Sequence, residues 1–164
     1  MTFHSVESSI YNQLQPIQDN LNLSVGGLPE TAKAYGEPAG NGWLSLQWVQ
    51  SIPIDRSLSN QTYQVEVDYK IDVRALRLRQ HMYNAVNEAE RLLHGFTPKG
   101  SYKPIQWEGS KFYGYQDKKF WWFAECYFKA YVIRSSEQQC IDYSDENLFP
   151  PLKIVEVCKI EGGE

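Results

Sequence analysis

The chain has 164 residues, of which 42% are hydrophobic and 22% charged, and its formal net charge is −4. This composition argues against a disordered chain and predicts one domain that can bury a core without disulfides or metals. Because it has no long basic run and no apolar stretch of spanning length, we expect neither a duplex nucleic acid partner nor a membrane. The N-terminal residues also lack the basic and apolar regions of a signal peptide, which predicts a cytoplasmic protein.

The first predicted element is an amphipathic helix over Thr2–Gln15. Its apolar residues recur at three- and four-residue spacing: Phe3, Val6, Ile10, Leu14 and Ile17. We expect Pro16 to end it, because an interior proline loses a backbone hydrogen bond and clashes with the preceding turn. A short alternating strand over Leu21–Val25 follows, and then a loop rich in glycine and proline over Leu28–Gly42.

Two strands are predicted next, and we expect them to pair as a hairpin across a polar turn over Asp55–Asn60. In the first, Trp43–Ile54, alternation places Leu44, Leu46 and Trp48 on one face and Trp43, Ser45 and Gln47 on the other. In the second, Gln61–Arg74, apolar and polar residues alternate without a break. That pattern is typical of an antiparallel strand with one face on the core and one in water.

A long helix is predicted over Ala75–His94. Gly95 directly follows the apolar stripe and Pro98 lies just beyond, which is typical of a helix C-terminus. Two further strands are predicted over Pro104–Tyr115 and Lys118–Arg134. The second of these is aromatic on both faces, which indicates that helices or a neighbouring subunit cover both.

The order of elements predicts an α+β fold, a two-layer sandwich with a mainly antiparallel sheet of about four to five strands and two helices on one face. This domain is expected over residues 1–134. Residues 135–164 are expected to form a C-terminal arm, in which Leu152–Ile160 has the composition of a strand.

The sequence holds no recognisable catalytic or metal-binding pattern. The histidines, His4, His81 and His94, have no metal-ligand spacing, and the cysteines, Cys126, Cys140 and Cys158, form no CxxC pair. The glycines between residues 36 and 42 do not join a strand to a helix, as a phosphate-binding loop would. We therefore expect no enzyme, no catalytic residues, no metal and no cofactor.

Two segments carry a resemblance to a known family. The strand YQVEVDYKIDVRA (Tyr63–Ala75) passes into a helix ending in LLHGFTP, and a later strand reads WFAECYFKAYV (Trp122–Val132). In this order, after an N-terminal helix, they resemble the tail terminator, or tail completion, proteins of Mu-like contractile-tailed bacteriophages. The resemblance spans residues 6–134. It implies a structural virion protein at the head-proximal end of the tail, assembled in the host cytoplasm as a hexameric ring.

Such a ring would cap the tail tube and sheath and join them to the neck or connector proteins. The candidate interface residues combine exposed aromatics with the arm: Trp43, Trp121, Phe123, Tyr127, Tyr131, Leu152, Ile154 and Val157. Another head–tail connector or a baseplate component is an alternative within the virion. A small-ligand-binding or hydrolytic α+β domain, with the aromatics forming a pocket, is the alternative from a different class.

Overall fold

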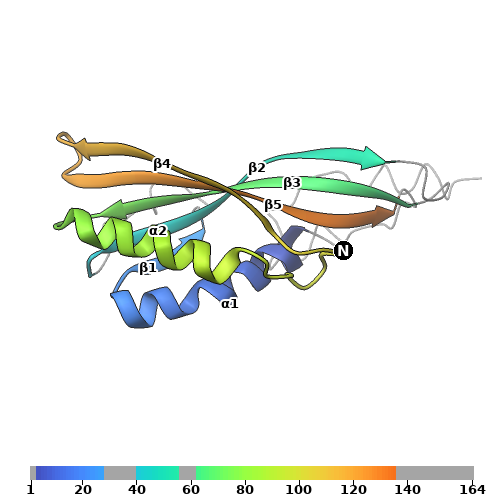
Figure 1. Ribbon diagram of the computed structural model, residues 1–164, viewed down its shortest axis with the longest axis horizontal. Helices are drawn as coiled ribbons and strands as arrows, with labels where there is room; N and C mark the ends of the chain where they lie inside the picture. Colours follow the sequence, from blue (N-terminus) through green and yellow to red (C-terminus); the bar gives the residue numbers. More distant parts are fainter. Residues whose placement is uncertain (1–2, 28–39, 56–61, 136–164) are drawn as a thin grey trace, which may run out of the picture.

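The computed structural model describes residues 3–27, 40–55 and 62–135, which form two helices and five strands (Figure 1). In chain order the elements are α1 (Phe3–Leu21), β1 (Ser24–Gly27), β2 (Gly42–Asp55), β3 (Thr62–Ala75), α2 (Arg79–Leu93), β4 (Gln106–Gln116) and β5 (Trp121–Ser135). Most of the predicted loop, and the predicted arm beyond Ser135, lie outside the described residues.

Helix α1 does not end at Pro16, and that prediction is wrong. The helix continues through the proline to Leu21 because its apolar stripe also continues: Ile17, one turn after Leu14, is fully buried. The carbonyl of Asn12, which loses its helical partner at the proline, belongs to an exposed residue and can bond to water. Asn22 then turns the chain with a φ of 54°, a left-handed conformation that asparagine tolerates.

The sheet has the order β1-β2-β3-β5-β4, in which β1 pairs with β2 in parallel and every other pair is antiparallel. The prediction of a mainly antiparallel sheet of four to five strands is thereby confirmed. The pairing of β2 and β3 as a hairpin is confirmed as well. Among the described residues, β1 flanks β2 only from Trp43 to Leu46, so the outer part of β2 has no strand partner on that side.

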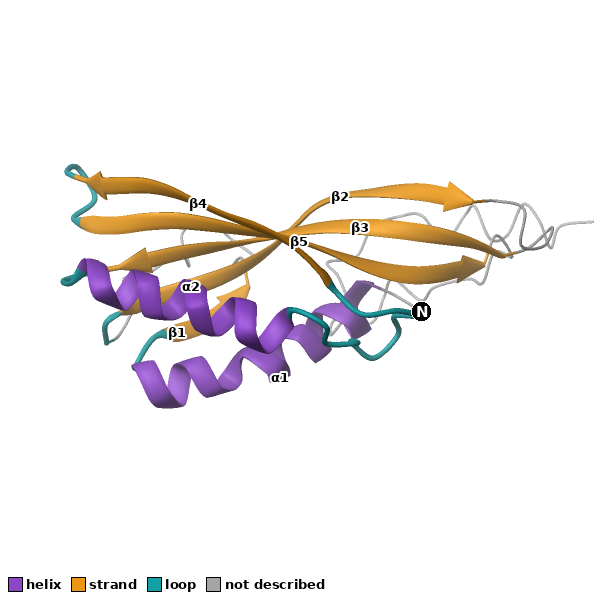
Figure 2. Cartoon of the chain, in the orientation of Figure 1, coloured by secondary structure: helices purple, strands orange, loops and turns teal. Residues whose placement is uncertain are grey.

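Both helices lie on one face of the sheet, as Figure 2 shows, and the predicted two-layer α+β architecture is confirmed. Alternate residues of β3 and β5 face the helices and build the core with the apolar stripes of α1 and α2. The largest buried side chains are Tyr69, Phe128, Ile10, Leu14, Ile17, Leu23, Leu44, Ile71 and Met82. We call the other face, on which no described helix lies, the open face. Neither helix is long and apolar enough to cross a membrane.

Helix α2 begins four residues later than predicted, because β3 extends to Ala75 and three residues separate strand from helix. Its C-terminus lies where the sequence indicates. His94 donates its backbone N–H to the carbonyl of Glu90, and Gly95 follows with a φ of +80°. The left-handed conformation that glycine allows turns the chain away from the helix at this point.

The faces of β2 follow the predicted alternation up to Trp48, where the burial departs from it. Trp48 lies opposite Tyr69 on the helix-bearing face but is 52% exposed. The contact with β1 ends at Leu46, before this exposed part of the strand, and a register shift follows at Val49. Trp43, on the open face, is instead buried, at 8% exposed.

The molecule has two distinct ends. At one end lie the β4–β5 turn, the C-terminus of β3 and the N-terminus of α2; we call it the hairpin end (Figure 1). At the opposite end β5 stops at Ser135, which pairs with Thr62 at the start of β3. Ser135, the last described residue, therefore lies far from the hairpin end.

Candidate protein interface

The five candidate interface residues that the structure describes share the open face. Trp43 comes from β2, and β5 contributes Trp121, Phe123, Tyr127 and Tyr131, at positions that alternate with its core residues. The two-faced pattern predicted for β5 is thus present in the fold. Leu152, Ile154 and Val157 lie outside the described residues.

Three of these aromatics gather around Arg74 of β3. The guanidinium carbon lies 5.0 Å from the ring centroids of both Trp43 and Trp121 and 5.8 Å from that of Phe123. The two indoles meet edge to face with centroids 5.0 Å apart. Asp72, only 5% exposed, places a carboxylate oxygen 3.6 Å from the same guanidinium. We call these five residues the Arg74 cluster, in which an ion pair is enclosed by aromatic rings.

A hollow of about 220 Å³ opens beside the Arg74 cluster. Its lining consists of Arg74, Tyr113, Gln116, Lys119, Trp121 and Phe123. The ammonium group of Lys119 lies 5.5 Å from the Trp121 ring centroid, so a second cation faces the same aromatic wall. Cations placed beside aromatic rings favour carboxylate and aromatic groups of a partner.

Tyr127 and Tyr131 lie further along β5 and engage residues of their own subunit. Tyr127 donates its hydroxyl to Glu125 and lies 3.3 Å from the Tyr113 hydroxyl, and the bond to Glu125 raises the pKa of the tyrosine. Tyr131 donates to Gln106 at 2.7 Å and is 3% exposed. Tyr131 therefore packs inside the subunit and offers little surface to a partner.

The charges between these aromatics form paired networks. The Nζ atom of Lys129 lies 3.0 Å from a carboxylate oxygen of Glu66, 3.6 Å from one of Asp68 and 3.5 Å from one of Glu108. The bond to Glu66 raises the pKa of the lysine. Lys70 similarly lies 3.6 Å from Asp72. The sequence suggests a solvated strand face for these acids, but they are held in ion pairs along the centre of the open face.

A second aromatic surface, missed from the sequence, covers the helix-bearing side of the hairpin end. It joins the first turns of α2 to the β4–β5 hairpin through four rings: Tyr83, Phe112, Tyr115 and Trp122. Phe112 lies 6.1 Å from Tyr83 and 6.4 Å from Trp122, centroid to centroid, and Tyr115 lies 5.1 Å from Trp122. Phe120, in the adjoining β4–β5 turn, is also exposed, at 70%. Exposed aromatics grouped in this way are typical of protein contacts.

The strand period could not reveal this surface because β4 contains two register shifts. They fall at Glu108 and Tyr113, next to glycines with positive φ, Gly109 and Gly114. Each shift inserts one residue and reverses which side chains face the helices beyond it. The dense aromatic composition of Phe112–Tyr115 was the available signal.

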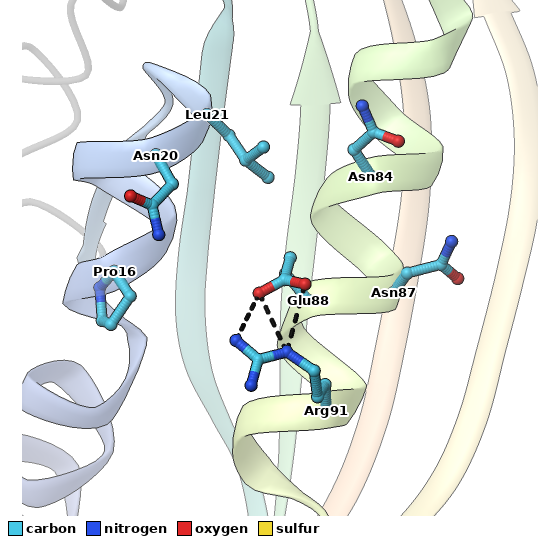
Figure 3. A pocket seen from close by; sticks show the side chains of 7 residues that line it. All are labelled: Pro16, Asn20, Leu21, Asn84, Asn87, Glu88 and Arg91. Carbon is cyan, nitrogen blue, oxygen red and sulfur yellow. Dashed lines mark hydrogen bonds and ion pairs between the residues drawn. The ribbon is translucent and has the colours of Figure 1, made fainter.

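A groove between α1 and α2 lies away from the aromatics that were expected to form the pocket of a ligand-binding or hydrolytic domain. The groove has a volume of about 520 Å³ and is lined by Pro16, Asn20, Leu21, Asn84, Asn87, Glu88 and Arg91 (Figure 3). Its two charged groups already bond to each other, with Arg91 Nη2 2.7 Å from Glu88 Oε2. The polar groups that line the groove are therefore side-chain amides and one ion pair, and none of the lining side chains is a nucleophile.

No group of three or more histidine, cysteine or acidic side chains in the described ranges could hold a metal ion. Cys126 is buried in the core, where desolvation raises the pKa of its thiol to about 12. A thiol in such surroundings is a poor nucleophile, because the thiolate is the reactive form.

The comparisons with known proteins find similarity in the fold of this chain. No protein-family model matches the sequence, and no curated protein matches it. Among solved structures, a chain from the virion of a native gene transfer agent particle is similar, with a TM-score of 0.58. The alignment has 14% sequence identity and covers 79% of this chain and 96% of that chain. At this identity the likeness is one of fold.

Proposed function

We propose that the chain is a structural protein of a phage-like virion and that it acts as a tail terminator. In this role a ring of its copies, six by the family resemblance, caps the tail tube and sheath and joins the tail to the neck. The observation that carries the proposal is the fold shared with a virion chain over nearly that chain's whole length. The protein is proposed to work by assembly, without catalysis.

The surfaces of the hairpin end support an assembly role. Aromatic rings lie on both sides of the β4–β5 hairpin, with the Arg74 cluster on the open face and Phe112 and Tyr115 on the other. Rings and arginines are the residues that contribute most to protein interfaces. A hairpin with such residues on both sides suits a position between two neighbours.

Assembly is tested first with the purified full-length chain. We expect light scattering and mass photometry to find a closed oligomer whose mass is a multiple of the 19.0 kDa subunit, six copies in the proposed ring. A variant with Phe112→Ser and Tyr115→Ser should assemble more weakly. Ile54→Ser, an equally exposed apolar residue at the opposite end, is the matched control. A chain that stays monomeric at high concentration contradicts the ring.

Placement within the particle is tested by electron microscopy of virions that carry the chain, with an antibody against it. Label at the head-proximal end of the tail supports the terminator. Label at the head vertex or at the baseplate would identify another connector or a baseplate component instead. Absence of label from intact particles, with the antibody active on the purified chain, would refute a structural role in the virion.

A further inference from the structure

The hairpin end combines its exposed aromatics with an excess of positive charge. In addition to Arg74, which is paired with Asp72, four basic residues of the described chain lie there, in the β3–α2 connection, the start of α2 and the β4–β5 turn: Arg77, Arg79, Lys118 and Lys119. Asp117 is the one acidic residue in the turn itself. The first turn of α2 contains no acidic residue, and its N-cap, Leu78, makes no side-chain hydrogen bond. The positive end of the helix dipole therefore adds to the same field.

The arrangement of these groups is held by contacts between them. The guanidinium carbon of Arg79 lies 5.6 Å from the Tyr83 ring centroid and 5.9 Å from that of Trp122. In the turn, Phe120 has a φ of 59°, which is strained for a bulky side chain, and its ring is exposed. Prearranged rings and cations lose less conformational entropy when a partner binds.

The chain beyond β5 has the opposite character. Residues 136–164 contain seven acidic residues and two lysines, whereas the hairpin end is basic. Four of the acids fall in the first part of this segment, which contains no basic residue: Glu137, Asp142, Asp145 and Glu146. Leu148 and Phe149 follow after Asn147. An acidic run that ends in two apolar side chains matches a basic surface that carries exposed rings.

Geometry places the hairpin end of the same copy beyond the reach of the first acids of this segment. Strand β5 runs from Trp121 to Ser135, so the two ends lie about 45 Å apart at about 3.3 Å per residue. The chain from Ser135 to Glu146 spans at most about 40 Å when fully extended. The acids nearer to Ser135 fall much further short. Glu137 and Asp142 can reach a hairpin end only on another copy.

We infer that the acidic segment 137–149 of one copy binds the basic, aromatic hairpin end of the next copy. This contact is heterologous, since two different surfaces meet, and repeated contacts of this kind close into a ring. The inference rests on the proposed function, because it specifies how neighbouring subunits of that ring are joined. The acceptor surface contains Phe112 and Lys119 as well as Trp121, which the sequence predicts to be an interface residue.

A charge swap in the full-length chain tests the contact. Variant A carries Lys118→Glu and Lys119→Glu, and variant B carries Asp145→Lys and Glu146→Lys. We expect each alone to weaken self-association about tenfold or more at low salt, and a chain with all four changes to recover it. Lys99→Glu with Lys103→Glu, the same change of charge away from the hairpin end, should leave association near wild type. Circular dichroism checks that every variant is folded.

Mixing the two variants distinguishes a contact between two copies from a contact within one copy. Each hairpin end in an equimolar mixture of A and B meets a tail of opposite charge only on the other variant. We therefore expect the mixture to assemble, in sedimentation velocity runs, where neither variant alone does. Recovery in the four-change chain without recovery in the mixture would mean a contact within one copy and would overturn the inference.

The remaining outcomes are also decisive. If A and B both assemble like the wild type, the inference is wrong while the proposed ring stands. If A is weakened and B is not, the basic surface binds another partner, and the acidic segment is excluded as its occupant. A wild-type chain that remains monomeric refutes the ring and the contact together.

Discussion

Replacement of Arg74 removes the centre of a partly buried ion pair that is enclosed by three rings. Arg74→Ala eliminates two cation–π contacts at 5.0 Å, each worth about 0.5–1 kcal/mol or more when desolvated. It also leaves the buried Asp72 with a weaker countercharge. Removing one partner of a fully buried pair costs about 3–5 kcal/mol. Here Lys70 remains 3.6 Å from Asp72, so this part of the cost is smaller, about 1 kcal/mol.

We therefore expect Arg74→Ala to lower the free energy of unfolding by about 2–3 kcal/mol. Arg74→Lys keeps the charge but loses the flat guanidinium, and should cost about 1 kcal/mol. In an Asp72→Asn background Arg74→Ala should cost about 1 kcal/mol less, because the ion pair is already weakened. Urea unfolding followed by tryptophan fluorescence and by circular dichroism measures these differences, with a midpoint shift of about 1 M for the alanine variant.

Two results would refute this reasoning. An Arg74→Ala variant within about 0.5 kcal/mol of the wild type would mean that the Arg74 cluster contributes nothing to folding. Equal losses for lysine and alanine would mean that the planar contact with the rings, rather than the charge beside Asp72, accounts for the effect. Addition of 0.5 M salt should change the wild-type stability little, because the pair is shielded from solvent.

Three further predictions concern the core and α1. Phe128→Ala removes a fully buried ring stacked between Tyr69 and Trp107, at 5.5 and 6.2 Å, and should cost about 3–5 kcal/mol in urea unfolding; a loss under about 1 kcal/mol would contradict this packing. Pro16→Ala restores the hydrogen bond to the Asn12 carbonyl but gives the unfolded chain more freedom. The net effect should stabilise the protein by about 1–2 kcal/mol and raise its Tm. A lower Tm would show that the proline is required. Because burial raises the pKa of the Cys126 thiol to about 12, the folded thiol stays protonated where the unfolded one ionises, so its contribution to stability is lost as the pH rises from about 9 towards 12. Peptide mapping after iodoacetamide treatment at pH 8.5 should find Cys126 unmodified in the native protein and modified in urea, and native modification would contradict its burial.

The fold could be predicted from the sequence where one periodicity held over many residues. The unbroken alternation of β3 and the apolar stripe of α2 predicted both elements to within a few residues, and Gly95 predicted the end of the helix. Pro16 was misread because local preference was weighed without the burial of Ile17, a tertiary term that the sequence does not display. The parallel pairing of β1 with β2 was likewise not predictable from local patterns.

The candidate interface was predictable only in part. The aromatics of β5 could be assigned to one face from their alternation, but their gathering around Arg74 depends on the register between β2, β3 and β5. Burial of Tyr131 by Gln106 and Tyr102 depends on the path of β4 and the segment before it. Phe112 and Tyr115 were missed because the register shifts in β4 interrupt the period from which their face would be inferred.

The central position of β3 has a consequence for the order in which the protein folds. Strand β3 pairs on one edge with β2, its neighbour in the sequence. On its other edge it pairs with β5, so that Thr62 pairs with Ser135 although the whole of α2 and β4 lies between them in the sequence. Pairings between distant segments form slowly, since the chain must close a long loop first. During synthesis on the ribosome, this edge of β3 cannot be fully paired until the last residues of β5 have emerged. The nascent chain is then most open to aggregation, and chaperones should bind it at that stage.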